Sequence, residues 1–140
     1  MTTLPDELLR RLAIAAEGVG LAIVEATVDT VADILSLIAS IRRAIADELL
    51  EVEMLREMVA AQYALEHRTD AERRGLASTL GVADPNTPNG FAELCAAIED
   101  RMREVNSAAD ERMAELANCE AALDHIESTA NDAAHDTSQQ

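Results

Sequence analysis

The sequence predicts an all-α protein: a long antiparallel helical hairpin or bundle with coiled-coil-like packing and a short N-terminal helix. Hydrophobic residues make up 49% of the 140 positions, yet there is only one Phe, one Tyr and no Trp. The core must therefore consist of small aliphatic side chains, which suit close packing between helices. Five Gly and three Pro are too few for the many turns that a β-sheet protein of this length requires.

The N-terminal segment is predicted to form a short helix over residues 5–17. Pro5 suits the first turn of a helix, and Asp6 follows at the positive end of the helix dipole. Gly18 and Gly20 then weaken any continuation, because each Gly inside a helix costs about 1 kcal/mol relative to Ala. We therefore expect a kink or a break after this helix.

A heptad pattern predicts a long helix over residues 21–67. Apolar side chains recur on alternating steps of three and four over about six repeats, which is the strongest sequence signal for coiled-coil-like packing. Arg42 and Arg56 occupy two further positions of this seam, where each either pairs with an acid on the facing helix or lies flat with its guanidinium in solvent. The seam consists of Leu21, Val24, Val28, Val31, Leu35, Ile38, Ile45, Leu49, Val52, Val59 and Tyr63, and Ile34, Ile41 and Leu55 widen it on one flank.

A short helix is predicted next, over residues 70–80, with Thr69 or Asp70 as its N-cap. Residues 81–88 form a proline-containing loop, and the following residues are predicted to begin the last helix.

The last helix is predicted over residues 88–128, with Thr87 as N-cap and Pro88 in its first turn. Residues 129–140 are small and polar without periodicity, so we expect a disordered tail. The helices together are expected to form a single domain over residues 1–128.

The net charge of −16 makes two classes of partner unfavourable, nucleic acids and anionic membrane surfaces. A surface this negative repels phosphate backbones and anionic headgroups, so binding to nucleic acid or to a membrane surface is disfavoured. The most apolar stretch, residues 12–41, is interrupted by acids and does not predict a membrane span. Two Cys without metal-type spacing fit a reducing cytoplasm, and we expect the protein there.

The sequence contains no arrangement of nucleophilic, acid–base or metal-binding residues that matches a known catalytic motif. Cys95 and Cys119 are too far apart along one predicted helix to share a metal or to form a disulfide, and we interpret them as buried inert thiols. No nucleophile, phosphate-loop or zinc motif occurs. We therefore expect no enzyme activity, no cofactor and no metal. The Met residues, among them Met54 and Met58, are interpreted as core residues, but an exposed Met face would suit adaptable recognition of a partner's amphipathic segment.

Part of the chain, residues 71–126, resembles a known family. The stretch Ala71–Val82 with Arg73, Arg74, Leu80 and Gly81, then Phe91–Leu94, Arg103–Asn106 and Ala121–Ile126, is similar in order to FlgN-type flagellar export chaperones. The resemblance implies cytoplasmic escort of hook-associated proteins before type III export. It also implies that the C-terminal helix holds the partner's C-terminal helix. By position, the implied partner-binding stripe is Met113, Leu116, Leu123 and Ile126.

Three hypotheses for function follow from these observations. The leading one is a non-enzymatic helical binding protein, an export-type chaperone that holds an amphipathic helix of a secreted, hook-associated partner. The second is a self-associating coiled-coil scaffold, and the third is a phasin-like coat on an apolar granule. We expect the partner to be either another protein with an amphipathic helix or a second copy of the chain, giving a heterocomplex or a homodimer.

Overall fold

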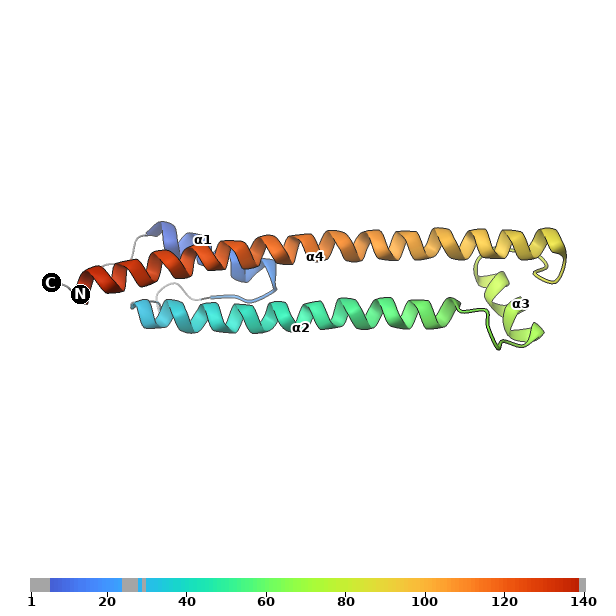
Figure 1. The fold of residues 1–140 in the computed structure, drawn as a ribbon, viewed down its shortest axis with the longest axis horizontal. Helices are drawn as coiled ribbons and strands as arrows, with labels where there is room; N and C mark the ends of the chain where they lie inside the picture. The colour runs from blue at the N-terminus through green and yellow to red at the C-terminus, as the bar shows by residue number, and fades with distance from the viewer. Residues whose placement is uncertain (1–5, 24–27, 29, 139–140) are drawn as a thin grey trace. The chain divides into compact units, whose positions relative to one another are not determined.

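Four α-helices make up the computed structural model, which describes residues 6–23, 28 and 30–138 (Figure 1). No strand occurs within these ranges, and the predicted all-α fold is confirmed. The helices are α1 (Asp6–Gly18), α2 (Val31–Tyr63), α3 (Asp70–Thr79) and α4 (Pro88–Ser138).

The chain divides into two compact units, where the sequence predicted a single domain over residues 1–128. Unit 1 comprises Met1–Glu51 together with Arg112–Gln140, and unit 2 comprises Val52–Glu111. The division arises because α2 and α4 each contribute one segment to either unit, and the buried side chains collect in two separate clusters. Each unit therefore has its own core.

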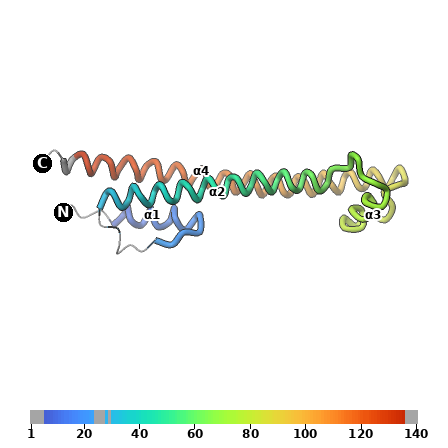
Figure 2. The backbone as a smooth tube through the Cα atoms, turned by 90° about the horizontal axis from the view of Figure 1, so that it is seen from below, coloured from blue at the N-terminus to red at the C-terminus, as the bar shows by residue number. Residues whose placement is uncertain are grey.

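Unit 1 is a three-helix arrangement of α1, the first part of α2 and the last part of α4 (Figures 1 and 2). The α2 and α4 segments run antiparallel, because Arg42 contacts Glu127 whereas Glu48, further along α2, contacts Arg112, which lies earlier on α4. Fully buried aliphatic residues from all three helices form the core. They are Leu12 and Ala16 of α1, Ile34, Ile38, Ile41 and Ile45 of α2, and Leu116, Leu123, Ile126 and Ala130 of α4.

The second helix begins ten residues later than the sequence predicted, at Val31 instead of residue 21. A side-chain cap accounts for this start: the Asp33 backbone N–H donates to Thr30 Oγ1 over 3.2 Å, and the Thr30 N–H donates to Asp33 Oδ2 over 3.2 Å. Such a reciprocal cap satisfies N–H groups at the helix start that otherwise lack partners. The expected break after the first helix is also present, because α1 ends at Gly18 and Gly20 has a φ of 75°.

The second helix also ends earlier than predicted, at Tyr63 instead of residue 67. Arg68 folds back over this end, and its Nη2 donates to the carbonyl of Ala61 over 3.0 Å and to that of Gln62 over 2.6 Å. His67, with a φ of 63°, turns the chain. A guanidinium on terminal carbonyls both satisfies acceptors and complements the negative end of the helix dipole.

The last helix is ten residues longer than predicted and runs to Ser138, so the prediction of a disordered tail over residues 129–140 is wrong up to that residue. Ala130 is fully buried in the core of unit 1, and Thr129 Oγ1 donates to the His125 carbonyl over 3.0 Å. Small residues carry no hydrophobic periodicity, so only packing against other helices distinguishes this last segment from coil. Residues 139–140 lie outside the described residues.

Unit 2 combines the end of α2, the whole of α3 and the start of α4 around a small core of Ala77, Val82 and Leu94. Both helix starts are capped at the predicted residues. Thr69 Oγ1 accepts the Glu72 N–H at 3.2 Å, and Thr87 Oγ1 accepts the Gly90 N–H at 3.0 Å. The cap of α4 is tight, because a Cβ on Gly90 would lie 1.6 Å from the Asp84 carbonyl oxygen.

Candidate functional site

The stripe that the family resemblance implied as partner-binding is part of the core of unit 1. Leu116, Leu123 and Ile126 are buried there against side chains of α1 and α2, and Met113 is half-buried. In this conformation three of the four residues of the implied stripe are therefore not accessible to a partner. The physical reason is α1: its residues Leu8, Leu12, Ala15 and Ala16 belong to the same buried cluster.

The predicted seam lies on α2 from Val31 to its last member, Tyr63, and departs from the prediction only before Val31. Val31, Leu35, Ile38, Ile45 and Leu49 are buried or half-buried in unit 1. Val52, Val59 and Tyr63 are half-buried or buried in unit 2. Leu21 is exposed and precedes the helix, as does Val28, which is buried in the core of unit 1 without being helical. Val24 lies outside the described residues.

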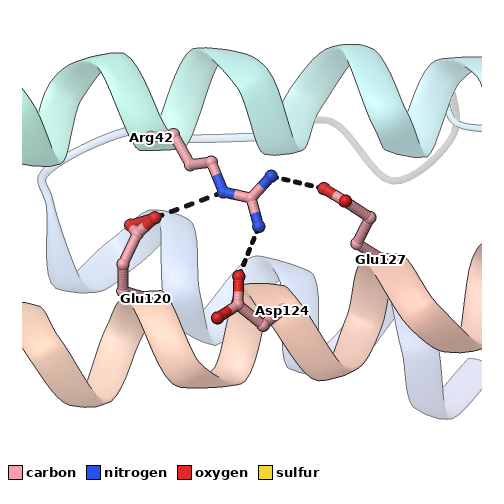
Figure 3. A network of polar contacts seen from close by, with 4 residues as sticks. All are labelled: Arg42, Glu120, Asp124 and Glu127. Carbon is pink, nitrogen blue, oxygen red and sulfur yellow. Dashed lines mark hydrogen bonds and ion pairs between the residues drawn. The ribbon is translucent and has the colours of Figure 1, made fainter.

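Arg42 pairs with acids on the facing helix, which was one of the two predicted alternatives (Figure 3). Its Nε donates to Glu120 Oε1 over 3.2 Å, its Nη2 donates to Asp124 Oδ1 over 2.5 Å, and its Nη1 contacts Glu127. The hydrogen bond with Glu127 is the largest cause that raises the pKa of Arg42 above its ordinary value. One guanidinium thus holds three carboxylates from successive turns of α4 and sets the register of the two helices.

Two further Arg residues link helices in the same way. Within unit 2, Arg56 pairs with the Asp110 carboxylate, and its Nη2 donates to the Asn106 carbonyl over 3.4 Å. Within unit 1, Arg112 pairs with Glu48 of α2, and its Nη2 donates to the Gly18 carbonyl at the end of α1 over 2.9 Å. In these contacts the guanidinium groups of Arg56 and Arg112 hold two helices together within a unit.

Unit 2 exposes three large apolar side chains side by side on α2, which we call the docking patch. Met54, Leu55 and Met58 are 57%, 52% and 63% exposed. Residues three and four apart are neighbours on a helix surface, so the three form one continuous face. At about 100° per residue the centre of this face lies roughly 100° around the helix from Val52 and Val59, which are half-buried.

The sequence predicted only part of the docking patch. Met54 and Met58 were interpreted as core residues, with an exposed Met face as the alternative, and the structure shows the exposed alternative. Leu55 was assigned to the flank of the seam, yet Ile34 and Ile41, assigned to that flank with it, are buried. The flank is covered where α1 widens the bundle in unit 1, and nothing among the described residues of unit 2 covers Leu55.

Acidic side chains border the docking patch. Glu53 and Glu57 lie one turn apart on its flank, and both are exposed. Within the part of the chain that the structure describes, neither carboxylate forms an ion pair. Arg56, the one Arg within a turn of Glu53 on this helix, is engaged with Asp110 instead. The patch is therefore an apolar surface with an uncompensated negative edge.

A second apolar surface lies in unit 1, where α1 rests on α4. A cleft of about 470 Å³ is lined there by Ile14, Ala15, Gly18, Cys119 and Ala122, among others. The Cys119 thiol donates to the Ala15 carbonyl over 3.3 Å, and burial raises its pKa. A raised pKa leaves less of the reactive thiolate at neutral pH, as expected of a structural thiol.

Neither a cluster of metal-binding side chains nor a helix able to span a membrane occurs among the described residues. Nowhere in residues 6–23, 28 and 30–138 do three His, Cys, Asp or Glu side chains come together to hold a metal ion. None of the helices traced in that part of the chain combines the length and the apolar character needed to cross a bilayer.

The chain matches no protein-family model, and no curated protein or solved structure shows significant similarity to it.

Proposed function

We propose that this protein is a non-enzymatic helical binding protein that holds an amphipathic helix of a partner protein on the docking patch. The observation that carries the proposal is the side-by-side exposure of Met54, Leu55 and Met58 on one face of α2. Methionine side chains are flexible and polarisable, so a Met-rich face adapts to apolar side chains of different shapes. An amphipathic helix laid along such a face presents its own apolar residues at the same spacing.

The patch supplies part of the free energy of binding. Full burial of a Met or Leu side chain contributes about 1.5–3 kcal/mol, and the apolar residues of the partner helix add their own burial, against which the entropy cost of association is set. Exposed single hydrophobic residues are ordinary on protein surfaces, whereas a contiguous group marks an interaction surface.

Export-type chaperone activity toward a hook-associated partner is the narrower form of this proposal, and it rests on the resemblance over residues 71–126. If the partner helix used the implied stripe, Leu116, Leu123 and Ile126 would first have to lose the contacts that bury them. The docking patch needs no such opening. We therefore favour the patch as the first binding surface of a cytoplasmic helical chaperone.

Binding of a synthetic amphipathic helix to the full-length chain tests the proposal. The probe is a labelled peptide with one leucine stripe, and its control is a scrambled peptide of the same composition that lacks the stripe. We expect the striped peptide to bind and the double variant M54Q/M58Q to weaken binding at least about tenfold. Gln matches Met in length and helix propensity, so circular dichroism of the variant should be unchanged.

Equal binding of the striped and scrambled peptides, or of the variant and the parent chain, would refute the proposal. Sedimentation of the chain without peptide measures its oligomeric state and so distinguishes a helix-binding protein from a self-associating scaffold. A dimer that dissociates in the M54Q/M58Q variant would identify a second copy as the occupant of the patch.

A further inference from the structure

We infer that the docking patch selects a cationic amphipathic helix, one whose apolar stripe is bordered by Arg or Lys. This inference rests on the proposed function and adds the charge of the partner. Its basis is the pair of carboxylates, Glu53 and Glu57, beside the exposed side chains of Met54 and Met58.

The two carboxylates repel each other in the free protein. Like charges four residues apart on a helix destabilise it by about 0.2–0.5 kcal/mol, and no cation within the described residues offsets this pair. A partner that brings a positive charge to this flank removes the repulsion and adds an attraction across the interface. Binding is thereby favoured beyond the contribution of the apolar contact.

The contacts of Arg56 leave the Glu53 and Glu57 carboxylates without an ion pair in the part of the chain that the structure describes. Glu53 lies one turn from Arg56, which would neutralise it if the guanidinium turned outward. Arg56 instead pairs with Asp110 and reaches the Asn106 carbonyl, both on α4. The neighbours of Glu57 one turn away in either direction are Glu53, Met54, Ala60 and Ala61, and none of them is basic.

The charge of the whole chain argues against a second copy as the occupant. Each chain carries a net charge of −16, and two copies meeting through the patch would bring their Glu53 and Glu57 carboxylates together. Juxtaposed like charges suppress the wrong partner, whereas an opposite charge both steers association and sets specificity. A cationic helix satisfies the apolar face and the negative edge at once.

Three labelled peptides with the same leucine stripe test the inference on the full-length protein: their flanking positions carry Arg, Gln or Glu. We expect the Arg peptide to bind at least about tenfold more tightly than the Glu peptide at low salt, with the Gln peptide between them. The preference should shrink as salt rises, because exposed charges are screened.

The E53Q/E57Q variant should lose most of the preference for the Arg peptide and keep its affinity for the Gln peptide. The variant E66Q/E93Q is the matched control, because it removes the same charge from two other exposed positions of unit 2. It should retain the preference of the parent chain. An equal loss in both variants would overturn the inference by showing that only the overall charge matters.

The failure of this inference can be told apart from failure of the proposed function. If all three peptides bind equally and M54Q/M58Q weakens them all, the patch binds helices without charge selection, and the inference alone falls. If no peptide depends on Met54 and Met58, the proposed function falls with it. Self-association lost in M54Q/M58Q would overturn the inference in favour of a second copy.

Discussion

Arg42 Nε on α2 donates a hydrogen bond over 3.2 Å to Glu120 Oε1 on α4, across the interface of unit 1. The same guanidinium also engages Asp124 and Glu127, so a single side chain ties α2 to about two turns of the facing helix. Its side chain is 32% exposed, which leaves the network partly screened by solvent. Its strength is therefore best judged by mutation.

Replacement of Arg42 by Ala should lower the free energy of unfolding by about 1 kcal/mol, because it leaves three carboxylates without their shared cation. Urea unfolding followed by circular dichroism measures the loss. Arg43→Ala is the matched control, since Arg43 is exposed on the same turn, and its effect should stay within about 0.5 kcal/mol. Equal effects of the two variants would contradict a structural role for the Arg42 network.

The attachment of α1 should depend on Leu12 and not on Ile14. Leu12 is fully buried, and its replacement by Ala should cost about 2–5 kcal/mol through lost burial and the cavity left behind. Ile14 is 63% exposed, and Ile14→Ala should change stability by less than about 0.5 kcal/mol. Thermal unfolding of both variants checks the difference. A similar midpoint for the two would mean that α1 does not pack as described.

Two glycines in unit 2 should respond to Ala in opposite directions. Gly90→Ala is expected to destabilise by about 1–3 kcal/mol, because its Cβ would collide with the Asp84 carbonyl, which is backbone and cannot rotate away. Gly75 lies within α3 with open space where a Cβ would be added, so Gly75→Ala should stabilise by up to about 1 kcal/mol. Denaturant midpoints measure both shifts, and two shifts of the same sign would refute the account of the Gly90 turn.

Removal of the Arg68 guanidinium should fray the end of α2. Arg68→Ala leaves the carbonyls of Ala61 and Gln62 without this donor and should cost about 1 kcal/mol. Hydrogen exchange should be faster at the last turn of α2 than in the parent chain. Arg74→Ala, an exposed position on α3, serves as control and should leave that exchange unchanged.

The Cys119 thiol should make unfolding depend on pH. Burial raises its pKa above the ordinary value of 9.0, so the folded state holds the thiol proton more tightly than the unfolded state. The associated stability is present below 9.0 and is lost as pH rises from there through the folded pKa, with a slope of at most about 1.4 kcal/mol per pH unit. Urea unfolding of the parent and of Cys119→Ala on either side of 9.0 measures it. The variant should lack this part of the decline, and identical slopes would contradict the assignment.

Features that depend on only a few neighbouring residues, such as helix caps, were predicted correctly from the sequence. Thr69 and Thr87 cap the helices that the sequence assigned to them, because an N-cap needs only a hydroxyl within one turn of the backbone N–H that it accepts. The glycine break after α1 is local in the same sense. The start of α2 was misplaced because the heptad pattern continues through residues 21–28, upstream of the reciprocal cap of Thr30 and Asp33 at which the helix begins.

The candidate site depended on tertiary packing. Leu116, Leu123 and Ile126, the implied binding stripe, are buried in the core of unit 1. Met54 and Met58, interpreted from the sequence as core residues, are exposed. A side chain's spacing shows that its helix has an apolar face, but not which partner covers that face. In unit 1, α1 and α2 cover the stripe on α4, whereas no described residue covers the docking patch in unit 2.

The sequence by itself thus determined that this protein is helical, aliphatic in its core and strongly acidic, because composition, periodicity and capping act within a few residues. Only the tertiary structure decided which apolar surface remains exposed. That outcome depends on where α1 packs and on how many helices surround α2 in each unit. Burial is a property of the assembled chain, so Leu123 became core and Met58 became surface although both are apolar positions on long helices.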